Sequence, residues 1–162
     1  MSIAVGDRLP QAIFLENGVE GIAPVTGEAL FAGRKVVLFG VPGAYTGVCS
    51  TRHVPSFIRV ADALRAKGVE EIACVAVNDP FVMKAWGEAT GATGAGIRML
   101  SDAEGTFARV IGLTFDNPAR GLIGRSKRYA LLAEDGVVKV LNVEASTGEC
   151  ELSAGETMLA AL

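Results

Sequence analysis

Residues 37–50 read VLFGVPGAYTGVCS, an apolar run that gives way to a Pro-Gly turn and then to a segment ending in a cysteine. An apolar run, a turn and a helix start are typical of a buried strand that leads into a helix. Cys49 then falls in the first helical turn, where unpaired backbone N–H groups and the helix dipole favour the thiolate. Because the thiolate is the nucleophilic form of cysteine, this position indicates a reactive thiol.

Outward from this stretch the chain alternates between strand and helix patterns. Strands are predicted at 12–15, 19–22, 35–41, 71–77, 97–100, 127–133 and 137–143, and helices after residues 49, 79 and 101 and over 155–162. Glu16-Asn17-Gly18 and Glu134-Asp135-Gly136 are predicted hairpin turns, and residues 116–124 a loop. This order predicts an α/β fold, a thioredoxin-like sheet with helices on both faces and an N-terminal β-hairpin, in a single domain over 1–162.

Composition narrows the class of protein. The chain has 162 residues, half of them hydrophobic, a net charge of −3 and three cysteines. No apolar run reaches the ~18 residues of a membrane span, the N-terminus shows no secretory signal, and dispersed basic residues give no nucleic-acid or membrane footprint. Three cysteines are an odd, small number that argues against a disulfide scaffold; they lie far apart, and with one histidine they offer no metal spacing. We therefore expect a soluble, cytoplasmic protein with reduced thiols.

Residues 42–50, with His53-Val54-Pro55, resemble the active-site loop of the peroxiredoxins, which are thiol peroxidases. Segments 73–82, 127–130 and 135–144 resemble the type II, or atypical, subfamily, so the similarity covers nearly the whole chain. The resemblance implies that Cys49 attacks the peroxide, with Thr46, Arg128 and Pro42 completing the site.

The same resemblance implies the substrates and partners. Hydrogen peroxide and alkyl hydroperoxides are the expected substrates, and thioredoxin, glutaredoxin or glutathione the expected reductant. A homodimer and no cofactor are also implied. One residue departs from the family pattern, because Gly47 stands where its members usually carry proline; glycine should leave the loop looser by several tenths of a kcal/mol.

Individual residues keep alternatives open. The Thr46 hydroxyl either caps the helix by accepting from the Cys49 N–H or bonds a substrate oxygen. Arg128 shares a strand face with Ala130 and Leu132, so it needs an anionic partner that a thiolate could supply, whereas Arg125 is predicted to be solvated.

The helix after Cys49 carries two further residues of note. Pro55 should kink it after its first turn. His53 is four residues from Cys49 on the same helical face, either as a structural or tuning group or as the base of a cysteine hydrolase.

The other two cysteines differ in their surroundings. Cys74 alternates with apolar residues in a strand and is predicted to be buried and inert. Cys150 lies in a polar segment and is predicted to be accessible, either as a resolving cysteine or as an incidental surface thiol. A rival to the enzyme is a non-enzymatic peroxide sensor that signals through oxidation of Cys49, and turnover separates the two.

Overall fold

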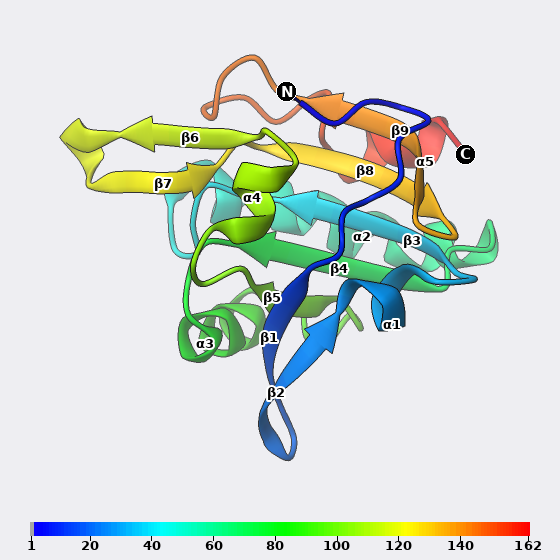
Figure 1. Ribbon diagram of the computed structural model, residues 1–162, viewed down its shortest axis with the longest axis horizontal. Helices are drawn as coiled ribbons and strands as arrows, with labels where there is room; N and C mark the ends of the chain where they lie inside the picture. The colour runs from blue at the N-terminus through cyan, green and yellow to red at the C-terminus, as the bar shows by residue number, and fades with distance from the viewer. Residues whose placement is uncertain (1) are drawn as a thin grey trace.

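The computed structural model describes residues 2–162 and contains a mixed seven-stranded sheet in the order β2-β1-β5-β4-β3-β8-β9 (Figure 1). Its strands are β1 (Ile13–Gly18), β2 (Gly21–Thr26), β3 (Lys35–Gly40), β4 (Glu71–Ala76), β5 (Arg98–Ser101), β8 (Tyr129–Glu134) and β9 (Val137–Val143). Strands β3, β4 and β5 run parallel, and antiparallel hairpins flank them on both sides. The predicted thioredoxin-like α/β fold with an N-terminal hairpin is confirmed.

Helices cover both faces of the sheet. They are α1 (Gly27–Phe31), α2 (Val54–Ala66), α3 (Pro80–Thr90), α4 (Thr106–Val110) and α5 (Gly155–Ala160), with a π-helical turn η1 (Cys49–His53) and a 3-10 turn η2 (Pro118–Arg120). Helices α2, α3 and α5 pack on the face that carries Phe39 and Cys74, and α1 and α4 on the face that carries Leu38 and Val75. Successive strand residues thus enter opposite cores, which explains the continuous apolar runs of β3 and β4.

The N-terminal hairpin turns two residues later than the sequence predicts. Strand β1 continues through Asn17, which pairs with Ile22, and the turn residues are Val19 and Glu20. The register is set by burial, because Phe14 and Val25 face each other in the core and a shift of one residue would expose both.

Residues 116–124 are not a plain loop, as the sequence predicted, but most of a second hairpin. Strand β6 (Thr114–Asn117) pairs with β7 (Leu122–Ser126) around η2. The strands are short and largely exposed, so they carry little hydrophobic alternation to reveal them. In Figure 1 this hairpin extends away from the main sheet beside the start of β8.

The helix predicted from Ser101 begins only at Thr106. Gly105 adopts φ of 71°, a left-handed conformation that breaks the helix on its N-terminal side. Asp102 still acts as a cap from further upstream, since its carboxylate accepts from the Phe107 and Ala108 N–H groups at 3.1 and 3.0 Å.

Within residues 2–162, no helix is both long and apolar enough to cross a bilayer. The same part of the chain contains no cluster of three or more histidine, cysteine or acidic side chains that could hold a metal ion.

Candidate active site

The loop that follows β3 carries Cys49, the cysteine that the sequence predicts to be reactive. A helical turn begins at Gly47, so Cys49 lies in the first turn, as the sequence predicts. Asn78, at the end of the neighbouring β4, holds the loop through its Oδ1, which accepts from the Ala44 N–H at 2.9 Å. Tyr45 adopts φ of 61°, a conformation that costs a non-glycine residue on the order of 1 kcal/mol. The loop is therefore fixed in a constrained shape.

The helix widens directly after the cysteine. In η1 the Val54 N–H donates to the carbonyl oxygen of Cys49, five residues earlier. Pro55 has no N–H, so the ordinary helical bond to the Thr51 carbonyl is not available. The deviation predicted at Pro55 takes the form of this π-helical turn, a feature that is frequent at functional sites.

Arg128 places a buried positive charge against the thiol. Its Nη2 lies 3.1 Å from Cys49 Sγ, and both side chains are almost wholly inaccessible, at 2% and 0% exposed. Nε and Nη2 donate to the Thr147 carbonyl at 3.1 and 3.0 Å, and Nη1 lies 3.0 Å from His53 Nδ1. Within residues 2–162 no carboxylate pairs with this guanidinium, and the Cys49 sulfur is the side-chain atom that lies against its Nη2.

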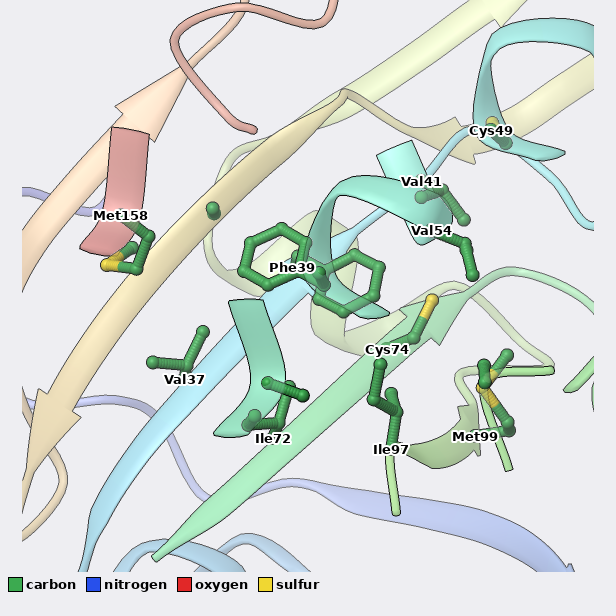
Figure 2. Close-up of a cluster of buried hydrophobic side chains, with 14 of the residues drawn as sticks. Val37, Phe39, Val41, Cys49, Val54, Ile72, Cys74, Ile97, Met99 and Met158 are labelled. Carbon is green, nitrogen blue, oxygen red and sulfur yellow. The ribbon is translucent and has the colours of Figure 1, made fainter. Parts of the chain in front are cut away.

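The predicted face of Arg128 is confirmed. Ala130 and Leu132, two and four residues further along, belong to the same buried cluster as Cys49. Figure 2 places Cys49 at one end of this cluster, beyond Val41 and Val54. The buried face of the sheet therefore places the Arg128 guanidinium beside the helical turn that contains Cys49.

His53 orients Arg128. Arginine can only donate and a carbonyl can only accept, so Nδ1 must accept from Arg128 while Nε2–H donates to the Ser153 carbonyl at 3.0 Å. Burial, together with the positive charge of Arg128, lowers the pKa of His53 to about 3. His53 is thus neutral, and its only lone pair is engaged. It cannot serve as the base of a hydrolase, and of the two roles left open the structural or tuning one applies.

The segment from Glu144 to Ser153 supplies the carbonyls that hold this pair. The buried Glu144 carboxylate accepts from the Glu151 N–H at 3.0 Å and from the N–H and hydroxyl of Ser153, each at 2.6 Å. Burial alone would raise the pKa of Glu144, but the hydrogen bonds from Ser153 and Glu151 outweigh it and lower that pKa. The Glu144 carboxylate therefore holds residues 151–153, at the C-terminal end of this segment. The bonds from Arg128 to the Thr147 carbonyl hold its middle.

Of the two roles left open for Thr46, its hydroxyl does not take the capping one. Its hydroxyl donates to the Gly43 carbonyl at 2.7 Å, and the Ser50 N–H bonds the Thr46 backbone carbonyl at 3.1 Å. Because the hydroxyl proton is committed to Gly43, the oxygen lone pairs remain able to accept a hydrogen bond from the O–H of a bound peroxide.

Arg125 is not solvated, as the sequence predicted, but packs against the turn after β3. It is half-buried, and its Nη1 lies 3.5 Å from the Pro42 carbonyl. A Cβ on Gly43 would approach the same Nη1 to 2.9 Å, so the guanidinium lies directly on this backbone. The sequence does not reveal this contact, because it predicts a loop where the structure has β7.

A cleft of about 330 Å³ lies beside the cysteine loop. The two parts of the chain that form it are the cysteine loop with Arg128 and the β6–β7 hairpin; its lining residues are Pro42, Thr46, Gly47, Val48, Phe115, Asn117, Arg120, Leu122, Arg128, Thr147 and Gly148. A larger groove of about 500 Å³ near α1 and α4 shares none of these residues. Cys49 itself is buried and does not line the cleft, but Arg128, which does, lies 3.1 Å from its Sγ.

The remaining cysteines are both buried. Cys74 lies in the core, as predicted, where burial raises its pKa well above the usual range. Cys150 is 5% exposed, so the prediction of an accessible thiol was wrong. Its segment is polar in sequence but is folded inward by Glu144. Burial raises the pKa of Cys150 and nearby Glu144 adds to the rise, against the opposing charge of Arg128.

Comparison with known proteins identifies the family. The Redoxin family model matches residues 4–159. The chain is 50% identical to peroxiredoxin-2E-2, chloroplastic, of Oryza sativa subsp. japonica, covering 99% of this chain and 73% of that protein. It is 47% identical to peroxiredoxin-2B of Arabidopsis thaliana, covering 99% and 98%. The chain belongs to the type II peroxiredoxins.

A solved structure agrees with this assignment. The reduced Prx3 of Vibrio vulnificus, in complex with hydrogen peroxide, superimposes on this peroxiredoxin with a TM-score of 0.92 at 49% identity, covering 98% of each chain. Peroxiredoxins are thiol peroxidases, so this peroxiredoxin is an enzyme that reduces peroxide with thiols. A purely signalling role is not favoured.

Several supporting residues escaped the sequence analysis. Thr147, Ser153 and Glu144 act through backbone carbonyls or local hydrogen bonds, which leave no residue pattern. Asn78 could have been found, because polar residues that follow adjacent parallel strands meet at one edge of the sheet.

Lowering the pH from about 7.5 to about 5 should destabilise the protein through its one histidine. In the unfolded chain the histidine pKa is ~6.5, whereas buried His53 stays neutral down to about 3. Between these values the unfolded state binds more protons, so the free energy of unfolding falls as the pH falls. Over this window the histidine contribution is about 2 kcal/mol. Urea unfolding at both pH values measures it.

The control for this experiment is His53→Gln, whose amide keeps one donor and one acceptor. The chain has no second histidine, so the variant should lack the whole histidine contribution. An identical loss in the wild type and in His53→Gln would show that His53 is not held neutral.

Proposed function

We propose that this peroxiredoxin reduces hydrogen peroxide and alkyl hydroperoxides through Cys49. The observation that carries the proposal is the contact of 3.1 Å between Arg128 Nη2 and Cys49 Sγ. It pairs a permanent positive charge with a buried thiol at the edge of an open cleft. Of the three cysteines, Cys49 alone makes such a bond to an arginine within residues 2–162.

The proposed reaction is a displacement at oxygen. The Cys49 thiolate attacks the terminal peroxide oxygen, so that an S–O bond forms while the O–O bond breaks. The bonding electron pair leaves with the second oxygen, as hydroxide or alkoxide, which takes up a proton to become water or an alcohol. Cys49 is left as a sulfenic acid.

Each neighbouring group has a role in this step. The Thr46 oxygen accepts a hydrogen bond from the peroxide O–H and orients the peroxide. The Arg128 guanidinium, already beside the sulfur, stabilises negative charge that develops on the departing oxygen. His53 acts through Arg128, since its neutral Nδ1 fixes the direction of the guanidinium. Pro42, buried beside the cleft, shields the thiol from water.

We propose that an external thiol, from thioredoxin, glutaredoxin or glutathione, returns the sulfenic acid to the thiol. Cys150 is the candidate resolving cysteine inside the chain, but its burial and the anchoring of its segment oppose that role. Movement of this segment would have to break the bonds of the Glu144 carboxylate and of the Thr147 carbonyl. The external route needs no such opening.

Two further properties belong to the proposal. A homodimer, which the family resemblance implies, is supported by large apolar side chains at the surface, among them Tyr45, Phe81 and Ile123 at 59%, 66% and 61% exposed. A reducing location, which we take to be the cytoplasm, is supported by three cysteines that are all unpaired.

Cys49→Ser should abolish peroxide turnover, and Arg128→Gln should lower kcat/KM by roughly 10²–10³-fold, the usual effect of losing one preorganised donor. The adjacent Lys127→Gln, which removes an exposed charge from the same connection, is the matched control and should retain activity. Stopped-flow consumption of hydrogen peroxide with a thiol donor measures all three.

The mechanism would be refuted by turnover in Cys49→Ser, or by equal losses in Arg128→Gln and Lys127→Gln. Circular dichroism and thermal melting of each variant separate a loss of chemistry from a loss of fold.

Cys150→Ser should turn over peroxide normally with an external thiol. After one equivalent of peroxide, non-reducing peptide mapping should find sulfenic acid or a mixed disulfide on Cys49, because Cys150 is buried and anchored. A Cys49–Cys150 disulfide in the map, together with slow turnover of Cys150→Ser, would instead establish a two-cysteine mechanism.

A further inference from the structure

The cleft beside the cysteine loop, which Arg128 and Thr46 line, is far larger than hydrogen peroxide requires. A water molecule occupies ~30 Å³ of liquid, so hydrogen peroxide needs roughly twice that. At about 330 Å³ the cleft instead falls at the lower end of the range for small-molecule sites, ~300–1,000 Å³. Space beyond the reacting oxygens is therefore available to an organic group.

One part of the cleft lining is polar and another part is apolar. Thr46 and Arg128, the groups that would hold the peroxide, come from the cysteine loop and the start of β8. The half-buried side chains of Val48, Phe115 and Leu122 form an apolar wall, and two of these come from the β6–β7 hairpin. A hydrocarbon portion next to the hydroperoxide would contact this wall.

Arg120 adds a second positive charge to the lining. It ends the 3-10 turn between β6 and β7, and its side chain is exposed. Within residues 2–162 it pairs with no carboxylate, and no acidic residue lines the cleft. Arg128, by contrast, already donates to Thr147, His53 and Cys49. Arg128, which lies beside the thiol, thus already has hydrogen-bond partners. Arg120, on the hairpin, has no carboxylate partner within residues 2–162.

We propose that Arg120 is a specificity residue that favours organic hydroperoxides carrying a carboxylate or similar anionic group. The inference rests on the proposed function and specifies the substrate class of the same cleft. The hydroperoxide end lies against Thr46 and Arg128, the hydrocarbon portion lies along Phe115 and Leu122, and the anionic end faces Arg120.

The chemistry of the reaction is unchanged by this arrangement. Cys49 forms the S–O bond with the terminal oxygen, the O–O bond breaks, and the alkoxide takes up a proton to leave as a hydroxy acid. Because Arg120 contacts the substrate away from the reacting oxygens, it binds substrate and transition state equally. Its effect should therefore appear in KM more than in kcat.

A matched pair of substrates tests the proposal. The probes are cumene hydroperoxide with a para-carboxylate and the methyl ester of the same compound. The wild type should prefer the acid over the ester by about three- to fivefold in kcat/KM, the size expected for an exposed charge pair. Added salt should reduce this preference. Arg120→Gln should bring the ratio close to one, whereas Lys127→Gln, an equal charge change outside the cleft lining, should keep it.

Arg120→Glu provides a second variant, in which the ester should become the better substrate. An acid-to-ester ratio near one in the wild type, or the same ratio in the wild type, Arg120→Gln and Arg120→Glu, would overturn the proposal. Hydrogen peroxide turnover by the wild type, measured in parallel, separates the two claims. If that turnover is present and the acid is not preferred, the specificity assignment fails while the peroxidase assignment stands.

Discussion

The buried guanidinium of Arg128 is the constraint on which the site depends. A positive charge removed from water is costly unless its donors are satisfied and an anion lies beside it. Here Nε and Nη2 reach the Thr147 carbonyl, Nη1 reaches His53, and Nη2 also reaches the Cys49 sulfur. Cys49 and His53 come from η1 and Thr147 from the C-terminal segment, so the fold must bring this turn, the residue before β8 and the C-terminal segment together.

The partners of Arg128 are themselves held by further hydrogen bonds. The Ser153 carbonyl accepts from His53, and the backbone and hydroxyl of Ser153 are fixed by the buried Glu144 carboxylate. On the other side, the Trp86 indole donates to the Ser50 hydroxyl at 3.0 Å, and Asn78 holds the loop at Ala44. The reacting groups therefore occupy a preorganised frame, which is the arrangement that lowers the barrier of a charged reaction.

Much of the architecture was predictable from local patterns. The strands β3, β4 and β8 are apolar on both faces, and the resemblances around Cys49 and over residues 127–130 pointed to Cys49 and Arg128, which the structure brings into contact. The β6–β7 hairpin was missed because exposed short strands carry little periodicity, and with it the contact of Arg125 was missed. The burial of Cys150 was missed for another reason, since a polar segment was pulled inward by Glu144, which lies six residues earlier. The roles of Thr147 and Ser153 belong to backbone carbonyls, which any residue type provides.

The most direct test of the central interaction is the protonation state of His53, followed by ¹⁵N NMR on the histidine-labelled protein between about pH 5 and pH 8. If Nδ1 accepts from Arg128, one neutral ring should be observed throughout, with the proton on Nε2 and no titration in this range. A ring that titrates near pH ~6.5, or that carries its proton on Nδ1, would mean that His53 does not hold the Arg128 guanidinium against Cys49.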